Sequence, residues 1–326
     1  MCPLLRGSSR EFFGACPVSA CALSFVRSND NLTADAVVFH DLPEKLAVPQ
    51  RTSPTQVYVF MHMESPVHVS DRYKSTLWNA AFNWTWSYRV DADIFCPVAY
   101  LKRAREVPTR AFLLSLRRNK TKAVAWFSSH CNVQSRRDEY VARLRRVIPV
   151  DIYGRCGSLQ CTGPTCEQML STDYMFYLSY ENSFCQDYVT EKFFRVFKEN
   201  VYVVPVVRGG ADYDKYFMRG VYVDSEWFES PEDLGRHLLE LMEDEETYVD
   251  MLWRRAHFLY HEHGIVDAKC QLCHRLHNVH RFAKTYPDLY EWNHHNRCRP
   301  PSPLKLKKSN KQKNSTALVG KVQKIK

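Results

Sequence analysis

Several polar side chains that could bind a ligand follow directly after an aromatic and apolar run of the chain. The run Tyr174–Tyr180 has the composition of a buried strand. The polar residues behind it are Glu181, Asn182, Tyr188, Glu191 and Lys192. A lysine near a helix start favours a phosphate group, and a carboxylate there can bind a ribose or sugar hydroxyl. These residue types predict a nucleotide-sugar site, and the alternative is a helix whose first acid only complements the helix dipole.

The elements on either side of this loop must position those side chains. Apolar residues from Val189 to Phe197 recur at helical spacing, and residues 201–207 form a second apolar run. The order strand, loop, helix, strand predicts a right-handed crossover in a parallel sheet, with the loop at the carboxyl ends of the strands. Ligands of open α/β sheets bind at that edge. We therefore expect Glu191 and Lys192 to face a ligand.

A second candidate for chemistry, Glu64, lies far from that loop in the sequence. Residues 56–61 predict a strand, and Glu64 follows it in the string Met63-Glu-Ser-Pro66. A carboxylate where a strand meets a loop can face a cleft and accept the proton of a substrate hydroxyl. The alternative is an exposed loop acid without a catalytic role.

The sequence from Tyr180 to Lys192, Tyr-Glu-Asn-Ser-x-x-x-Asp-Tyr-Val-Thr-Glu-Lys, resembles the signature of the α1,3/4-fucosyltransferases, which form glycosyltransferase family 10. The family usually has Phe where Tyr180 stands. Strings similar to the acceptor-binding half of these enzymes are Glu64-Ser-Pro66, Phe82-Asn-Trp-Thr85 and Tyr88-Arg-Val-Asp-Ala-Asp-Ile94. The resemblance runs from about Cys16 to about His277, and the pattern is most similar to the invertebrate α1,3-fucosyltransferases.

The resemblance implies an α/β fold of the GT-B type, in which two Rossmann-like domains face a cleft. The implied division is residues 1–110 for an acceptor-binding domain, 111–265 for a Rossmann-like domain that binds GDP-fucose, 266–298 for a Cys-rich closing segment and 299–326 for a basic disordered tail. The polar, arginine-rich stretch 97–120 is expected to cross between the domains.

The same resemblance implies an inverting transferase that moves L-fucose from GDP-β-L-fucose to a GlcNAc hydroxyl of a glycoprotein glycan, in α1,3 linkage, with the N-glycan core as one acceptor. Inversion needs one displacement and one general base, and Glu64 is the candidate base. The residues implied for donor binding are Arg137, Asn182, Tyr188, Glu191 and Lys192. Arg136 is the rival of Arg137 for the diphosphate. A catalytically inactive glycan-binding homologue is the alternative function.

The string Asp91-Ala-Asp93 raises the question of a metal, because Asp-x-Asp binds a metal that bridges the diphosphate in another glycosyltransferase architecture. It lies far from the phosphate loop in sequence, and Ile94 and Phe95 indicate that the two acids close a packed strand end. We therefore assign no metal ligand and expect no obligatory cofactor, with a divalent cation left open as a stimulant.

The net charge of +9 is concentrated at one end of the chain. From Arg299 onward there are nine basic residues and no acidic one, so the remainder is neutral. A general groove for nucleic acid is therefore not supported, although a polyanion binder acting through this tail is a rival function.

Twelve cysteines and four Asn-x-Ser/Thr sequons indicate an oxidising secretory lumen. Asn31 and Asn119 are the candidate glycosylation sites, because Asn83 lies in an aromatic run that should be packed. Cys270 and Cys273 resemble half of a zinc site. Disulfides that join these two cysteines to Cys16 and Cys21 are the favoured alternative, and the resemblance to the family implies the same arrangement.

Family members are normally anchored in the Golgi by one N-terminal membrane span. No apolar run of this chain approaches the roughly 18 to 20 residues that a span requires. We therefore expect a Golgi-lumen protein whose anchor either precedes this chain or is missing from it.

Overall fold

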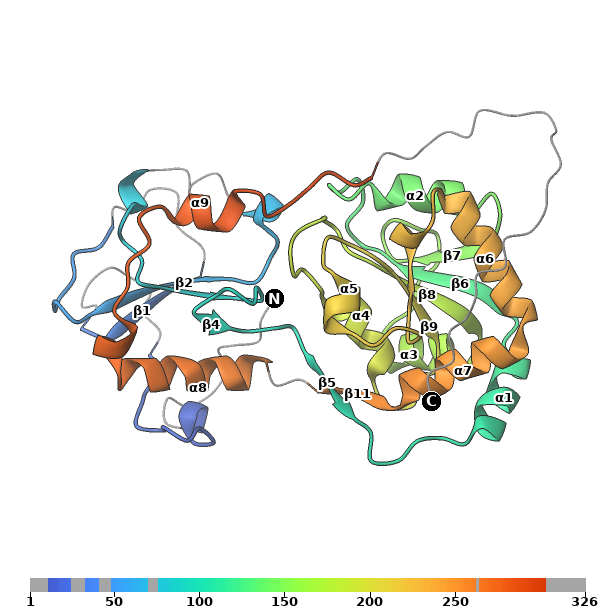
Figure 1. Cartoon of the computed structure of the whole chain (residues 1–326), viewed down its shortest axis with the longest axis horizontal. Coiled ribbons are helices and arrows are strands. Elements are labelled where there is room, and N and C mark those ends of the chain that lie inside the picture. Colours follow the sequence, from blue (N-terminus) through green and yellow to red (C-terminus); the bar gives the residue numbers. More distant parts are fainter. Residues whose placement is uncertain (1–10, 25–32, 41–47, 70–75, 262–263, 303–326) are drawn as a thin grey trace.

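The computed structural model describes residues 11–24, 33–40, 48–69, 76–261 and 264–302, which form two lobes, each built on a parallel sheet (Figure 1). The strands are β1 Ala36–His40, β2 Val57–His62, β3 Trp84–Ser87, β4 Ile94–Phe95, β5 Tyr100–Arg103, β6 Lys122–Phe127, β7 Val150–Tyr153, β8 Tyr174–Tyr180, β9 Val204–Arg208, β10 Val223–Asp224 and β11 Phe258–His261. The α-helices are α1 Arg110–Asn119, α2 Arg137–Leu144, α3 Pro164–Thr172, α4 Glu191–Phe194, α5 Tyr213–Tyr216, α6 Pro231–Glu243, α7 Glu245–Ala256, α8 Gly264–Leu276 and α9 Leu289–His294.

The first lobe is a parallel sheet in the order β1-β2-β3-β4. Because side chains alternate across a strand, β2 is divided between two cores. Val57, Val59 and Met61 pack with Ala268 and Leu272 of α8. The intervening aromatic residues of β2 pack with the segment that leads into α9, and Figure 1 shows α8 and α9 on opposite faces of the sheet. The C-terminal part of the chain therefore completes the first lobe.

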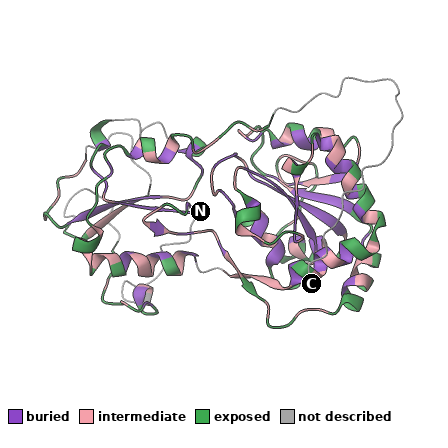
Figure 2. Ribbon diagram, viewed as in Figure 1, coloured by how far each residue is buried: buried purple, intermediate pink, exposed green. Residues whose placement is uncertain are grey.

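The second lobe is a parallel sheet in the order β10-β9-β8-β6-β7. Every residue of β8 and β9 is buried, as expected for strands covered by helices on both faces (Figure 2). The connection from β8 through α4 to β9 is the predicted strand–loop–helix–strand unit. All the carboxyl ends of these strands consequently point to one edge of the lobe.

Some element boundaries differ from the sequence prediction. The helix expected from Val189 to Phe197 is the short α4 followed by a 3-10 turn at Arg195–Phe197. The stretch 97–120 crosses between the lobes as expected, but it also forms β5 and α1. Helix α7 ends at Ala256, because the chain turns soon afterwards into β11, which pairs antiparallel with β5. This pairing joins segments about 160 residues apart, so no pattern among neighbouring residues of the sequence predicts it.

A second connection between the lobes is the C-terminal strap, residues 297–302, which runs from α9 back to the second lobe (Figure 1). The strap forms backbone hydrogen bonds to the loop after β8, from Gln186 N to Arg297 O at 2.7 Å and from Arg299 N to Phe184 O at 2.8 Å. The expectation of disorder from residue 299 onward is therefore wrong for residues 299–302, which have specific partners. The rest of the expected tail, 303–326, lies outside the described residues.

Disulfides join distant segments as well as neighbours. Cys16 pairs with Cys270 and Cys21 with Cys273, which ties the N-terminal segment to α8 as expected. The pairs that the sequence left open are Cys131–Cys156, Cys161–Cys166 and Cys185–Cys298. The last of these fastens the strap to the second lobe.

Of the two candidate glycosylation sites, Asn119 is exposed at the end of α1, whereas Asn31 lies outside the described residues. Asn83 is held by contacts, since its side chain accepts a hydrogen bond from Tyr58 N and donates one to Lys284 O. Among the helices of the described ranges, none is both long and apolar enough to cross a membrane.

Candidate active site

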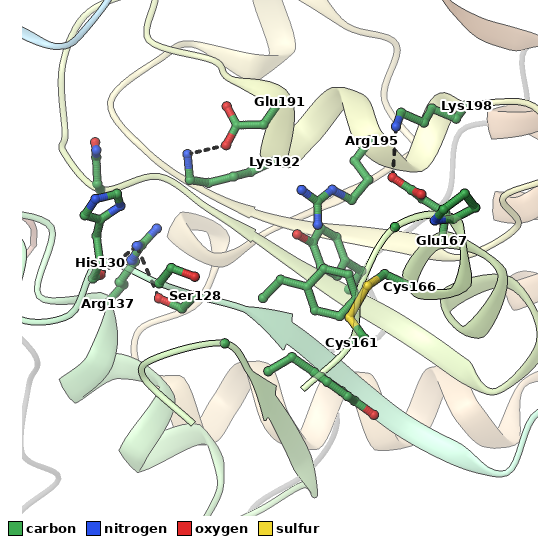
Figure 3. A pocket seen from close by; sticks show the side chains of 18 residues that line it. Ser128, His130, Arg137, Cys161, Cys166, Glu167, Glu191, Lys192, Arg195 and Lys198 are labelled. Carbon is green, nitrogen blue, oxygen red and sulfur yellow. Dashed lines mark hydrogen bonds and ion pairs between the residues drawn. A yellow bond between two sulfur atoms is a disulfide. The ribbon is translucent and has the colours of Figure 1, made fainter. Parts of the chain in front are cut away.

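A pocket of about 720 Å³ opens at the carboxyl edge of the second sheet (Figure 3). It is framed by the ends of β6, β7 and β8, by the start of α3 and by α4. The side chains that line it include Ser128, His130, Arg137, Asn182, Glu191, Lys192, Arg195 and Lys198. This is the position at which the crossover topology predicted a ligand.

The pocket carries more basic than acidic side chains. Its cations are Arg137, Lys192, Arg195 and Lys198, and its carboxylates include Glu167, which is paired with Lys198 at 2.9 Å. The arrangement suits a phosphate-containing ligand.

Lys192 lies at the centre of a small polar network. Its Nζ donates to Thr190 Oγ1 at 2.8 Å and to Glu191 Oε1 at 3.1 Å, and it lies 3.4 Å from Glu181 Oε2. Burial lowers the pKa of Lys192, but Glu181 and Glu191 outweigh it and raise that pKa above its usual value. The ammonium group therefore stays charged beside the pocket.

Glu181 holds this network in place by accepting hydrogen bonds from Thr190. It is fully buried, and its carboxylate accepts from Thr190 N at 2.8 Å and from Thr190 Oγ1 at 2.8 and 3.0 Å. Burial raises the pKa of Glu181, and the charge of Lys192 opposes that rise. Since Thr190 caps α4 through its hydroxyl, Glu181 holds the start of the helix that presents Glu191 and Lys192.

The structure separates the two arginines that competed for the diphosphate. Arg137 is buried and lines the pocket, and its guanidinium donates to Tyr180 O at 2.7 Å and to His130 O at 2.9 Å. Its Nε has no hydrogen-bond partner among the described residues. Arg136 is exposed and paired with Glu139 on the surface. Arg137 is therefore the arginine at the pocket, and it also supports the end of β8.

Glu64 and Tyr188 do not line this pocket. Glu64 follows β2 in the first lobe and is exposed, and its Oε2 accepts a hydrogen bond of 2.9 Å from the Tyr188 hydroxyl. Tyr188 belongs to the same loop as Lys192 but was expected to hold a hydroxyl of the donor. In the structure its hydroxyl contacts the Glu64 carboxylate of the other lobe, and its role in donor binding stays a prediction.

Sequence reasoning missed Arg195 and Lys198. Both follow Lys192 at intervals of three residues, so the helical spacing could have placed all three on one side of the α4 segment. It also missed the Cys161–Cys166 loop, which forms the opposite rim of the pocket (Figure 3). The position of that rim depends on how residues 154–163 fold, and no sequence pattern predicts it.

Asp91 and Asp93 are engaged within the first lobe. Asp91 pairs with Arg89, while Asp93 accepts from Thr85 N at 3.0 Å and from Lys284 Nζ at 2.9 Å. Neither lines the pocket. The two acids close the turn before β4, which is the arrangement that the sequence analysis favoured over a metal site.

The sequence matches two family models. The model described as "Glycosyltransferase family 10 (fucosyltransferase) C-term" matches residues 117–292, and the model described as "Fucosyltransferase, N-terminal" matches residues 6–99. Together they span both lobes.

Two curated relatives come from Drosophila melanogaster. The alpha-(1,3)-fucosyltransferase C is 39% identical over 319 residues, which covers 89% of this chain and 73% of the relative. The glycoprotein 3-alpha-L-fucosyltransferase A is 34% identical over 288 residues, covering 85% of this chain and 55% of the relative.

A crystal structure of an alpha1,3-fucosyltransferase with GDP has the same fold. It aligns with a TM-score of 0.52 at 15% identity, covering 80% of this chain and 82% of the other. Its likeness and the two lobes with parallel sheets confirm the expected GT-B fold.

Proposed function

Because the chain belongs to glycosyltransferase family 10, the fucosyltransferases, we propose that it transfers L-fucose from GDP-β-L-fucose to a GlcNAc hydroxyl of a glycoprotein glycan. The product is an α1,3 linkage, formed with inversion at the fucose C1. One observation carries the proposal: a single segment, residues 181–192, bears Lys192, one of the cations of the pocket, and contacts the candidate base Glu64 in the other lobe through Tyr188.

The pocket binds the donor. Lys192 and Arg137 meet the diphosphate, and Glu191 and Asn182 are placed to bind hydroxyl groups of ribose or fucose. As the bond between C1 and the phosphate oxygen breaks, negative charge builds on the departing GDP. The fixed cations stabilise that charge in the transition state.

Glu64 is the general base. It takes the proton of the acceptor hydroxyl while that oxygen forms its bond to C1 on the face opposite the departing GDP. One displacement inverts the configuration, so a second carboxylate acting as nucleophile is not required.

Transfer proceeds without an obligatory metal, because the basic side chains already provide counter-charge for the diphosphate. Asp91 and Asp93 are engaged by protein groups and lie outside the pocket. EDTA should therefore leave the rate of transfer largely unchanged, and a strict requirement for added Mg²⁺ or Mn²⁺ would contradict this part of the proposal.

The acceptor is a glycan of the secretory pathway, and the protein acts in the Golgi lumen. The disulfides of the structure fit an oxidising compartment. Incubation with GDP-fucose and a panel of defined glycans, followed by mass spectrometry, would distinguish the asparagine-linked GlcNAc of the core from an antenna GlcNAc.

The decisive variant is Glu64→Gln. It keeps the size of the side chain and a hydrogen-bonding oxygen for Tyr188 but removes the basic carboxylate. We expect kcat to fall by roughly 10²- to 10⁴-fold, the usual contribution of a general base. GDP affinity, measured by isothermal titration calorimetry, should stay unchanged.

Asp35→Asn serves as the matched control, because that acid also belongs to the first lobe but is exposed and lies outside the pocket. Its rate should remain within a few-fold of the wild type. A fully active Glu64→Gln enzyme would move the base to another carboxylate. GDP binding without any fucose transfer by the wild-type protein would favour the inactive glycan-binding homologue.

A further inference from the structure

One side chain of the pocket, His130, has no part in the proposed function so far. It follows β6, and its imidazole lines the pocket. Figure 3 shows the ring at the same end of the pocket as Arg137 and Lys192. Arg195 and Lys198 lie at the other end. The His130 side chain is exposed, and within the described ranges the only hydrogen bond to this residue goes to its backbone oxygen.

The backbone around His130 is held from two sides. On the side of α2, Arg137 donates to His130 O at 2.9 Å. On the side of the loop after β7, Cys131 is bonded to Cys156, and Cys156 N donates to Ser128 O at 3.1 Å. A segment held by a disulfide and by these hydrogen bonds has few alternative positions. The imidazole is therefore kept beside the pocket.

The two cations at this end have few hydrogen-bond donors to spare. The Arg137 guanidinium donates to Tyr180 O, to His130 O and to a serine hydroxyl. Lys192 Nζ donates to the side chains of the two residues that precede it. Their charges still attract phosphate, but a diphosphate also presents several oxygens that accept hydrogen bonds. A neutral imidazole has one ring N–H, and that of His130 is not taken by any described protein group.

We propose that His130 binds the nucleotide sugar: its imidazole donates a hydrogen bond to the diphosphate, and protonation of the ring adds a positive charge there. This inference rests on the proposed function. Histidine is the side chain whose charge ordinarily changes between about pH 5 and 8. Because a charged ring attracts phosphate more strongly than a neutral ring, affinity for the nucleotide sugar should rise as the pH falls through this range.

Other charged groups surround the same end of the pocket and must be distinguished from His130 in a pH titration. They are Arg136, Arg137, Asp138 and Glu139 at the start of α2, Arg155 after β7, Glu181 at the end of β8, and Glu191 and Lys192 of α4. Burial raises the pKa of Glu181, so this carboxylate is the main competing source of a pH response. A test must therefore change His130 while leaving Glu181 in place.

The measurement is the dissociation constant of GDP-fucose, obtained by isothermal titration calorimetry without acceptor at about pH 6 and about pH 8. GDP-fucose is the ligand because both of its phosphates are esterified on either side, whereas a terminal phosphate such as that of GDP changes charge near about pH 6. The wild type should bind about 3- to 10-fold more tightly at the lower pH, the contribution of one added charge near the surface. Equal affinity at the two pH values would overturn the inference.

Two variants separate the hydrogen bond from the charge. His130→Ala removes both and should weaken GDP-fucose binding by about 10-fold at the higher pH, and by more at the lower pH. His130→Asn keeps an N–H donor but cannot become charged, so it should recover most of the affinity at the higher pH and lose the pH dependence. Both should keep the melting temperature of the wild type, since the side chain is exposed.

Three outcomes would contradict the proposal. An alanine variant that binds GDP-fucose like the wild type would show that the imidazole does not meet the ligand. An asparagine variant no better than alanine at the higher pH would overturn the hydrogen bond. A pH response that persists in His130→Asn would belong to Glu181 and would overturn the role of ring protonation.

His257→Asn is the matched control, because His257 belongs to the same lobe and lies outside the pocket. Its affinity for GDP-fucose and the pH dependence of that affinity should equal those of the wild type. The same loss of pH dependence in this control would assign the effect to overall charge and overturn the inference. Failure of the proposed function looks different, because then the wild type itself binds no GDP-fucose or transfers no fucose.

Discussion

At the scale of single residues, the pocket depends on charged side chains that are buried or partly buried. Burial without a partner of opposite charge would favour their neutral forms. Lys192 keeps its positive charge because Glu181 and Glu191 lie beside it. Glu181 in turn is a fully buried carboxylate that would be costly without Thr190 and Lys192. The cation that meets the donor is therefore one member of a small network.

Lys192→Ala should weaken GDP and GDP-fucose binding to the same extent, by about 10- to 100-fold, because its charge meets the diphosphate that both share. Isothermal titration with each ligand measures the effect. Lys215→Ala, which removes an exposed lysine of the same lobe outside the pocket, is the control and should bind GDP normally. Unchanged GDP affinity in folded Lys192→Ala would refute the assignment.

At the scale of elements, the short α4 has only one turn and cannot be stable by its own propensity. Its start is fixed by the Thr190 cap, and the cap is fixed by Glu181 at the end of β8. Phe193 and Phe194 then bury the other side of the helix in the core. The strand end, the cap and the aromatic pair together aim Lys192 at the pocket.

Thr190→Val should disturb this arrangement while keeping the shape of the side chain. It removes a hydroxyl that donates to Glu181 and accepts from Lys192, which we expect to cost about 1–3 kcal/mol in the free energy of unfolding. Urea unfolding measures the loss, and GDP binding should weaken with it.

Thr190→Ser is the control, because it restores the hydroxyl and should recover most of both properties. If Val and Ser variants were equally stable and bound GDP equally well, the hydroxyl would not hold the helix start.

At the scale of the whole molecule, two backbone connections among the described residues tie the lobes together, besides side-chain contacts such as that of Tyr188 with Glu64. One is the antiparallel pair β5 and β11. The other is the C-terminal strap, in which Cys298 is bonded to Cys185 and Arg299 and Ser302 both contact Glu226. Because α8 and α9 belong to the first lobe, the strap returns the chain to the second lobe at its end and restrains the separation of the two.

Cys185→Ser/Cys298→Ser should lower the free energy of unfolding by about 2–4 kcal/mol, because the two residues lie 113 positions apart and the bond closes a long loop. Denaturant unfolding with a matched non-reduced wild type measures the change. Fucose transfer should fall as well, since the loop that carries Tyr188 loses its tie to the strap.

Cys161→Ser/Cys166→Ser is the control for stability, because that bond spans only 5 positions and should contribute less. Equal losses in the two double variants, or a Cys185/Cys298 variant as stable as the wild type, would argue that the strap is held by its other contacts alone.

Much of the second lobe could be predicted because its signals are local. The apolar run of β8, the polar loop behind it and the helical spacing after Val189 placed Lys192 and Glu191 at the edge of a parallel sheet, where the pocket lies. Glu64 at the end of β2 followed from the same kind of pattern. The pairing of Cys16 and Cys21 with Cys270 and Cys273 was expected from the cysteine pattern of a secretory chain and from the resemblance to the family.

The sequence by itself therefore determined the strands, the donor loop and the residue types at its end, because alternation, helical spacing and a long string of specific residues are properties of neighbours in the chain. Only the tertiary structure decided that Tyr188 meets Glu64, that Arg137 and not Arg136 reaches the pocket, and that Cys298 returns to Cys185. The arginines differ by one position on a turn, and the other pairs are separated by more than 100 residues. The placement of Arg137 depends on packing inside the second lobe, and the other two contacts depend on how the first lobe and the strap meet the second lobe, which no local pattern records.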